Sequence, residues 1–394
     1  MTKDVNIGLF GFGCVGKGLY DVLNNSRNFS ADISKIVVKN RNKKRSLPEY
    51  AFTYDKSDVL NDERINLVTE LIDDVNEAYD IVTQALKNGK NVVSANKKMI
   101  AENLEELVAL QREHGTSLLY EASACASIPI IRTLEEYYDN ELLHSVRGIF
   151  NGSSNYILTK MFEEGVSYED ALKEAQDLGF AETDPTLDVG GYDAKYKLVI
   201  LTLHSYGLYL NPAEVFNYGI QSLADFDMQY AREKRLKIKQ VAKVFRASDD
   251  EIAAYVLPHF ISEESDLYTV DYEYNGVIVQ GAFSDKQFFR GKGAGGHPTG
   301  SAVLSDISAN RYDYKYEYRK NGKHNGVRFS NDVDLKIYFR YAEESQFDRS
   351  KFVQIYERYE NGNGLNYVIA DVNLQTLISD PYFTQQKTFL AEIE

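Results

Sequence analysis

Short apolar runs alternate with amphipathic stretches through the first third of the chain. Strands that alternate with helices of about ten residues indicate βαβ units and a parallel sheet. Residues 1–128 are therefore predicted to form an α/β domain of the Rossmann-type, doubly wound, nucleotide-binding class. The apolar runs that predict its strands are 5–10, 33–38, 67–72, 91–94 and 117–120, and the amphipathic stretches that predict its helices are 16–24, 77–88 and 104–114.

The pattern changes after residue 128. We expect an α+β domain with a mixed sheet at 129–320, and a C-terminal segment at 321–394. In this domain we expect a helix at 129–139, β-type segments at 268–272, 277–280 and 287–290, and a helix at 300–308 after a glycine-rich turn. In the C-terminal segment, apolar runs at 333–341 and 367–374 flank 350–361 and predict a small βαβ-like unit.

A glycine motif stands directly after the first predicted strand and opens the first helix. Such a GxGxxG sequence provides a tight turn, a close approach to a pyrophosphate, and close packing of helix on strand, in that order. The free N–H groups at the helix start then bind the pyrophosphate. A purely structural glycine turn is the alternative. The predicted cofactor-binding residues here are Gly11, Phe12, Gly13, Cys14, Val15 and Gly16.

The second predicted strand is followed by positive charge. NAD-binding domains typically place Asp or Glu there, where it binds the ribose 2′-OH. Here Lys39–Arg45 contains no acid, and five of its seven residues are basic, in a chain of net charge −15. The cluster predicts NADP(H) as the preferred cofactor, with NAD(H) also accepted. A solvated basic loop is the alternative.

Two polar segments have the composition of a binding site. Ser94–Lys98 follows the fourth predicted strand, and ligands of doubly wound sheets bind at strand carboxyl ends. Ser94 and Lys97 are therefore candidate cofactor residues. Asn151–Tyr156 is rich in short polar side chains and is a candidate substrate-binding segment.

The strongest candidate for proton transfer lies at 179–197. Asp193 and Lys197 are four residues apart on a predicted helix and share one face, whereas Lys195 faces elsewhere. The helix becomes strongly apolar after Lys197, so its ammonium is expected to be partly desolvated, as in many proton-transfer lysines. Glu182 and Asp188, in the preceding acidic loop, are suited to binding a substrate ammonium. An ordinary ion pair is the alternative.

Composition narrows the function further. The net charge of −15 argues against general binding of nucleic acid or anionic membranes. Two cysteines and the lack of a signal-like leader or a membrane-length apolar run favour a cytoplasmic protein. Neither the cysteines nor the histidines have the spacing of zinc ligands.

These segments, in this order, resemble homoserine dehydrogenases. The resemblance rests on GFGCVG at 11–16, SANKK at 94–98, YEASACASIPII at 120–131, GIFNGSSNYIL at 148–158, GFAETDPTLDVGGYDAKYKL at 179–198 and GKGAGGHPTGSAV at 291–303. It implies an NAD(P)-dependent, monofunctional, homodimeric enzyme in which residues 129–320 form the catalytic and dimerisation domain. Such enzymes interconvert L-homoserine and L-aspartate 4-semialdehyde in threonine and methionine biosynthesis.

The resemblance also implies roles for individual residues. Lys197 matches the acid/base lysine, with Lys97 and Asp193 as its catalytic partners. Glu182, Asp188 and Asp193 match substrate-binding positions. Lys39 falls where relatives often carry an Arg beside the 2′-phosphate, and Gly179 and Gly295 match glycines that line the cofactor.

Two further features are implied by the family alone. A structural sodium ion, held largely by main-chain carbonyls, would map to Glu121, Ala124, Ala126 and Ile128. The C-terminal segment is compatible with a shortened ACT-like regulatory module.

Two other functions stay open at the level of sequence. One is a phosphorylating semialdehyde dehydrogenase with Cys125 as the nucleophile. The other is an NADPH-binding sensor without catalysis, which would leave the Asp193–Lys197 pair without a purpose.

Overall fold

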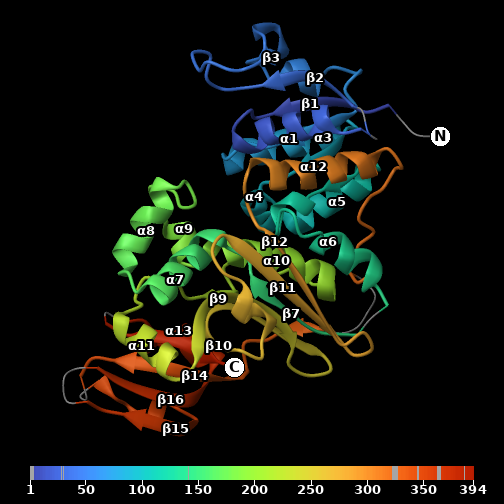
Figure 1. The fold of residues 1–394 in the computed structure, drawn as a ribbon. Helices are drawn as coiled ribbons and strands as arrows, with labels where there is room; N and C mark the ends of the chain where they lie inside the picture. The colour runs from blue at the N-terminus through green and yellow to red at the C-terminus, as the bar shows by residue number, and fades with distance from the viewer. Residues whose placement is uncertain are drawn as a thin grey trace. The chain divides into compact units, whose positions relative to one another are not determined.

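The computed structural model describes residues 4–394 apart from 28, 30, 141, 322–326, 344–345, 362–364 and 386. The chain divides into two compact units, and each unit is built from two stretches of sequence. Met1–Asp139 and Gly291–Arg319 form the first, and Asn140–Arg290 and Lys320–Glu394 form the second (Figure 1). The functional domain boundaries at 128 and 320 stay predictions, because these units are defined by packing alone.

The first unit is built on a six-stranded sheet in the order β3-β2-β1-β4-β5-β6, and every neighbouring pair is parallel. The predicted Rossmann-type class is confirmed. Its strands are β1 (Asn6–Phe10), β2 (Asp32–Val37), β3 (Phe52–Thr53), β4 (Leu67–Glu70), β5 (Asn91–Ser94) and β6 (Leu118–Leu119). The helices between them are α1 (Cys14–Asn25), α2 (Ser57–Leu60), α3 (Val75–Lys87), α4 (Lys97–Glu102) and α5 (Leu104–His114).

A helix from much later in the chain completes the first unit. α12 (Gly296–Asn310) packs on α1 so closely that a Cβ on Gly18 would lie 2.0 Å from the carbonyl oxygen of Gly296. Glycine at 18 therefore allows backbone contact between the two helices (Figure 1). The helix expected at 129–139 is a short α6 (Ile130–Arg132) that continues as π-helix over Thr133–Tyr137.

The second unit contains a large mixed sheet, as predicted. Its strands follow the order β12-β11-β7-β9-β10-β17-β14-β16-β15, with β8 and β13 also paired to β10. β17 pairs parallel with β10, whereas β7, β9, β10 and β11 pair antiparallel with one another. The strands are β7 (Leu143–Ile149), β8 (Phe216–Asn217), β9 (Leu236–Arg246), β10 (Glu251–Ser262), β11 (Tyr274–Gly281), β12 (Lys286–Lys292), β13 (Arg328–Phe329), β14 (Asp334–Tyr341), β15 (Gln354–Tyr359), β16 (Asn366–Asn373) and β17 (Phe389–Ile393).

Helices pack on both faces of this sheet, since α11 and α13 join buried clusters on opposite sides of β14. α7, α10 and α11 all pack on β9. α10 is buried along almost its whole length, which explains the apolar run after Lys197. The helices are α7 (Gly152–Glu164), α8 (Tyr168–Asp177), α9 (Thr186–Val189), α10 (Tyr192–Tyr206), α11 (Asp225–Glu233) and α13 (Leu374–Ser379).

Two local predictions in this unit are wrong. The middle of the supposed βαβ tail is a strand, because Ile355 and Glu357 are partly buried between exposed neighbours, a period of two. β15 and β14 both pair antiparallel with β16, so the tail is an antiparallel sheet. The strand expected at 268–272 is instead a 3₁₀ turn, Asp266–Thr269, followed by Tyr272 at φ +57°. That backbone conformation does not fit a strand.

The tail shares a core with the rest of its unit. Tyr338, Tyr367 and Phe389 from the tail strands pack in one buried cluster with Tyr230 of α11 and Phe260 of β10.

No helix in the described part of the chain is long and apolar enough to cross a membrane.

Candidate functional site

The first unit has a cavity of about 890 Å³ at the carboxyl ends of β1, β2 and β4. Gly11 and Gly16 are required by the protein's own packing, since a Cβ on either would lie within 2.5 Å of a main-chain oxygen. A Cβ on Gly13 would meet no atom within 4 Å. Because Gly13 faces open space, its small size is explained best by a ligand that approaches the backbone there. The cavity is lined by Gly11–Val15 of the glycine motif, Val37–Arg41, Lys43, Arg45, Tyr54–Lys56, Leu71–Asp74, Glu77, Ile81 and Phe10.

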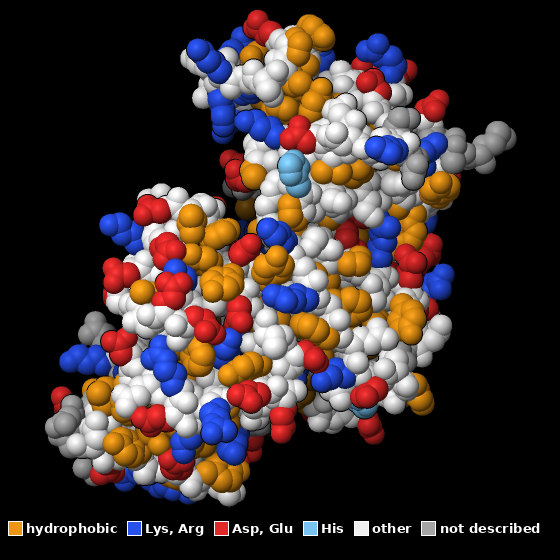
Figure 2. Space-filling view, in the orientation of Figure 1, with side chains coloured by type: hydrophobic (Ala, Val, Ile, Leu, Met, Phe, Trp, Pro, Cys, Tyr) orange, Lys and Arg blue, Asp and Glu red, His pale blue; other side chains and the backbone are white. Residues whose placement is uncertain are grey.

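Basic side chains gather at the cavity rim beside β2 and β3 (Figure 2). Lys39, Arg41 and Lys43 all line the cavity. The Arg41 guanidinium lies 4.6 Å from the centre of the Tyr54 ring, a cation–π arrangement that keeps it over the cavity.

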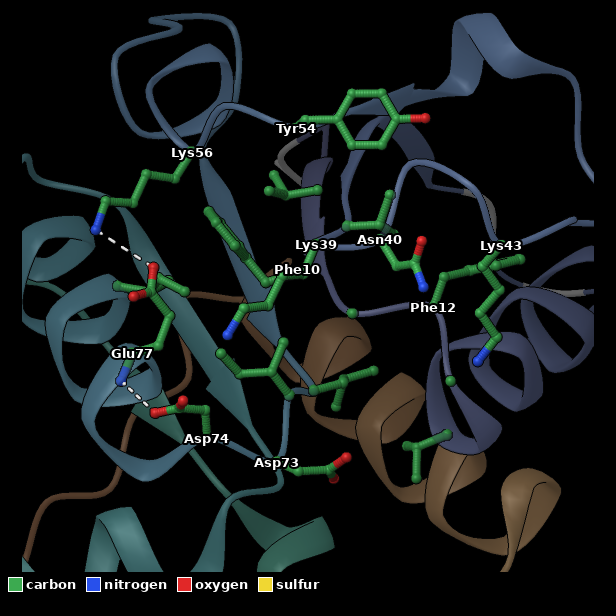
Figure 3. A pocket seen from close by; sticks show the side chains of 18 of the residues that line it. Phe10, Phe12, Lys39, Asn40, Lys43, Tyr54, Lys56, Asp73, Asp74 and Glu77 are labelled. Atoms are coloured by element: carbon green, nitrogen blue, oxygen red, sulfur yellow. Dashed lines mark hydrogen bonds and ion pairs between the residues drawn. The ribbon is translucent and has the colours of Figure 1, made fainter.

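Sequence analysis missed another cation at this cavity. Lys56 lines it and forms ion pairs with Glu77, at 3.3 Å, and with Asp80. Acidic side chains from the start of α3 thus lie opposite the basic loop (Figure 3). Lys56 follows the two-residue strand β3, which is too short to give a periodic signal.

Ser94 is buried at the end of β5 and holds the neighbouring strand end in place. Its hydroxyl donates to Glu70 at 2.6 Å and accepts from the main-chain N–H of Asn96 at 3.1 Å. Burial raises the pKa of Glu70 to about 7, although hydrogen bonds from Ser94 and the Ile72 N–H oppose the shift. Asn96 in turn caps α4, so Lys97 stands at the first position of that helix.

The glycine segment at the start of α12 also contacts the glycine motif that follows β1. A Cβ on Gly296 would lie 3.0 Å from the main-chain oxygen of Cys14, and Gly295 has φ +112°. The structure therefore places Gly295 near the start of α1, within the same unit as Gly11–Gly16.

In the second unit, the predicted pair forms a buried ion pair on α10. Lys197 Nζ lies 2.8 Å from Asp193 Oδ2, and each residue is 6% exposed. Lys197 also donates to the main-chain oxygen of Phe150 at 2.6 Å. A buried lysine with two good acceptors has a fixed direction, which is what a positioned proton donor needs.

Asn151 joins this pair to the acidic loop. Its Nδ2 donates to Asp193 Oδ2 at 3.0 Å and to Asp188 Oδ1 at 2.7 Å, while its Oδ1 caps α7 by accepting from the Ser154 N–H. The structure thus brings Lys197, Asp193 and Asp188 together. The polar segment at 151–156 signalled a site, but only the structure shows which carboxylates Asn151 contacts.

The other predicted residues of this unit lie in or near the same loop. Glu182 is exposed between α8 and α9, and Gly179 has φ +76° just after α8. Lys195 points elsewhere than Lys197, as expected: its ammonium lies 5.0 Å from the Tyr192 ring centre, and burial lowers its pKa.

The segment predicted to hold sodium is buried in the first unit. The Glu121 carboxylate accepts from the N–H groups of Ile131 and Arg132, so its side chain is already in use. Ala126 has φ +44°, which turns the chain sharply between the expected carbonyl ligands. Each carbonyl has two lone pairs, so a main-chain cation site is compatible with the contacts here. The described residues contain no group of three or more His, Cys, Asp or Glu side chains placed to hold a metal.

A parallel sheet with an open glycine loop, and a buried lysine–aspartate pair in a second unit, define an NAD(P)-dependent dehydrogenase. Comparison with known proteins is more specific. The family model "Homoserine dehydrogenase" matches residues 129–308, and its NAD-binding domain model matches residues 11–121. The chain belongs to the homoserine dehydrogenase family.

Individual relatives agree with this assignment. The homoserine dehydrogenase of Bacillus subtilis is 35% identical over 316 residues, which cover 78% of this chain and 73% of that protein. The Helicobacter pylori enzyme is 37% identical over 314 residues, covering 78% and 74%. The crystal structure of the Thiobacillus denitrificans enzyme covers 100% of this chain and 98% of its own, with a TM-score of 0.87 and 28% identity.

The activity follows from the family. The protein is an oxidoreductase that uses a nicotinamide cofactor and acts on a hydroxyl group, interconverting L-homoserine and L-aspartate 4-semialdehyde in amino-acid biosynthesis. The comparisons lend no support to the two alternatives, a Cys125-dependent enzyme and a non-catalytic sensor. Cys125 is moreover fully buried, whereas a nucleophile must reach its substrate.

Proposed function

We propose that Lys197 is the general acid and base of the reaction. A bound nicotinamide cofactor would supply the hydride that reduces the aldehyde carbon of the substrate. Lys197 protonates the oxygen that becomes the hydroxyl group, and it takes that proton back in the oxidising direction. The observation that carries this role is the buried Lys197–Asp193 pair, which directs the ammonium without leaving it in bulk water.

The carboxylates around the pair are proposed to hold the amino-acid end of the substrate. Asp193 orients Lys197, and Asp188 and Glu182 offer negative charge to the substrate ammonium. Asn151 supports this arrangement, because it ties Asp188 and Asp193 to the start of α7. Lys97 is proposed as a second catalytic cation that stabilises negative charge on the reacting oxygen.

We propose NADP(H) as the preferred cofactor, bound by the glycine motif and the basic rim. The glycine loop offers N–H groups to the pyrophosphate, and Lys39, with Arg41 and Lys43, offers charge to the 2′-phosphate. A hyperthermophilic archaeal homoserine dehydrogenase of known structure, described as a complex with NADPH, is 27% identical. It covers 80% of this chain with a TM-score of 0.69, and its ligand supports the same choice. Ser94, Gly179 and Gly295 are the remaining proposed cofactor residues.

We infer that the protein binds a sodium ion on the main-chain carbonyls of Glu121, Ala124, Ala126 and Ile128. We also infer that it is a homodimer in solution and that it is located in the cytoplasm. Sodium is tested by comparing the melting temperature in NaCl with that in a chloride of a larger cation at equal ionic strength. The dimer is tested by the mass in solution.

The decisive test of the proposed cofactor choice is an assay of L-homoserine oxidation with NADP⁺ and with NAD⁺. We expect reduction of both cofactors, with the higher kcat/KM for NADP⁺. Equal or greater kcat/KM for NAD⁺ would contradict the proposed role of the basic rim.

A further inference from the structure

A fully buried amide lies beside the Lys197 site, and within the described part of the chain only its nitrogen has a hydrogen-bond partner. Asn275, on β11, is 0% exposed, and its Nδ2 donates to the main-chain oxygen of Phe150 at 3.1 Å. Its Oδ1 is buried and has no hydrogen-bond partner among the described residues. An unpaired buried acceptor is unfavourable, so apolar packing alone does not explain an amide here.

The carbonyl that Asn275 binds is also the acceptor for Lys197. Phe150 O receives the Lys197 ammonium at 2.6 Å and the Asn275 amide at 3.1 Å, which uses both of its lone pairs. This contact fixes the orientation of the amide, because a flipped amide would place two oxygens against each other. Asn275 therefore determines where the Phe150 carbonyl points, and that carbonyl determines where the Lys197 ammonium lies.

The chain that carries Asn275 is itself held firmly. Asn155 Nδ2 donates to the main-chain oxygens of Val270, Tyr272 and Tyr274, at 2.9–3.1 Å. Lys239, buried on β9, donates to the Val270 oxygen at 2.6 Å and pairs with Asp271 at 2.9 Å. The approach to β11 is thus anchored on two sides, which gives Asn275 the rigid support that a positioning residue needs.

The ammonium of Lys197 carries three hydrogens. Two are directed at Phe150 O and Asp193 Oδ2. With those two directions fixed, tetrahedral geometry fixes the third, which is the one available for a substrate oxygen. A shift of the Phe150 carbonyl would therefore turn the third N–H away from its target.

We propose that Asn275 is a positioning residue for the reaction and acts on Lys197 through the Phe150 carbonyl. This inference rests on the proposed acid/base role of Lys197. It assigns Asn275 no contact with substrate or cofactor. Its removal should lower kcat and leave the KM values for homoserine and NADP⁺ nearly unchanged, because binding groups stay in place while the proton donor moves.

The test is the pair of variants Asn275→Ala and Asn275→Leu. Displacement of a catalytic group by about 1 Å costs up to roughly 100-fold in rate. We expect kcat to fall by about 10- to 100-fold in both variants, with each KM within about threefold. Asn275→Leu keeps a similar size but has no donor, so a kcat within about threefold of wild type in that variant would overturn the proposal.

Asn366→Ala is the matched control. Asn366 is also buried in the second unit and donates its amide to one main-chain oxygen, that of Ala342, at 3.2 Å. If loss of such a bond harms the enzyme only through stability, both alanine variants will lower the melting temperature, and neither will change kcat at a permissive temperature. That result for Asn275→Ala would also reject the proposal.

The double variant Asn275→Ala/Lys197→Ala tests two hypotheses separately, namely that Lys197 is the acid and base and that Asn275 acts through it. If Asn275 acts through Lys197, Asn275→Ala will cause no further loss in the Lys197→Ala background. A full additional loss there would reject the proposed route while leaving the role of Lys197 intact. If instead Lys197→Ala alone retains wild-type kcat, the proposed acid/base role fails, whatever the result for Asn275.

Discussion

At the scale of single residues, α10 carries a charge pair that would be unfavourable in isolation. Lys197 and Asp193 are both buried one helical turn apart, and each would cost several kcal/mol if left unpaired. Their mutual contact, the Phe150 carbonyl and the Asn151 amide supply the missing partners. A buried pair of this kind is better explained by a need for a directed ammonium than by stability.

We predict that Lys197→Ala removes most turnover and leaves cofactor binding intact. General acid–base groups contribute about 10²- to 10⁴-fold to rate, so kcat should fall by that factor. NADPH affinity, measured by fluorescence titration, should change by less than about threefold, since Lys197 and the cofactor cavity lie in different compact units. Residual turnover within about threefold of wild type would remove Lys197 from the acid/base role.

Glu70 should make the stability of the protein depend on pH. Its pKa is about 7 in the folded protein and about 4.5 when exposed, so the folded state binds the proton more tightly. Its contribution to the free energy of unfolding is therefore complete below about pH 4.5 and is lost as pH rises through 7. A shift of this size corresponds to about 3 kcal/mol.

Glu70→Gln should flatten this dependence. Between pH 5 and pH 8, the free energy of unfolding in urea should change by about 2–3 kcal/mol less in the variant than in wild type. Glu113→Gln, an exposed glutamate on α5 of the same unit, is the control and should follow wild type. Parallel pH curves for wild type and Glu70→Gln would show that Glu70 does not titrate in this window.

At the scale of elements, sequence predicted those features that depend on neighbours along the chain. The glycine motif, the charges after β2 and the four-residue spacing of Asp193 and Lys197 are local patterns. The partners of these residues are not local. Asn151 and Asn275 reach the site from 46 and 78 residues away from Lys197 in sequence, so only the fold brings them there.

Two strands of the second unit were not predicted, for a related reason. β10 is almost continuously buried, and a continuous apolar run lacks the alternation that identifies a strand. β15 was misassigned because its exposed faces carry charges and tyrosines that also suit a helix. It is a strand because it pairs with β16, and that pairing is a long-range contact.

The loop after β2 should determine the preference for NADP(H) over NAD(H). Replacement of Lys39, Arg41 and Lys43 by Ala should weaken NADPH binding by about tenfold or more, because loss of even one charge-assisted bond to a phosphate costs about 1.5–3 kcal/mol. NADH affinity should change by less than about threefold. Lys44→Ala is the control, since Lys44 belongs to the same loop but does not line the cavity. Equal loss for both cofactors would identify the cluster as a solvated loop.

At the scale of the whole molecule, the C-terminal strand joins the tail to the catalytic sheet. β17 lies between β10 and β14, and its Glu392 contacts three side chains of β9 and β10. Lys243 and His259 lie 2.8 Å from the carboxylate, and the Tyr255 hydroxyl donates to it at 2.6 Å. Burial alone would raise the pKa of Glu392. The neighbouring His259 and Lys243 outweigh this effect and hold the pKa well below its usual range.

The tail strands should therefore be needed for stability but not for cofactor binding. Truncation at Asn331 removes β14–β17, and with them Glu392 and the tail half of a core shared with α11 and β10. The melting temperature should fall sharply, whereas the cofactor cavity, built from the first unit, should still bind NADPH. Glu392→Gln is the point probe: it leaves Lys243 and His259 without their anion, at a cost of about 3 kcal/mol, or roughly 6–12 °C. A truncated protein with wild-type melting temperature and mass in solution would show that the tail is dispensable, and an unchanged Glu392→Gln would show that β17 is held by packing alone.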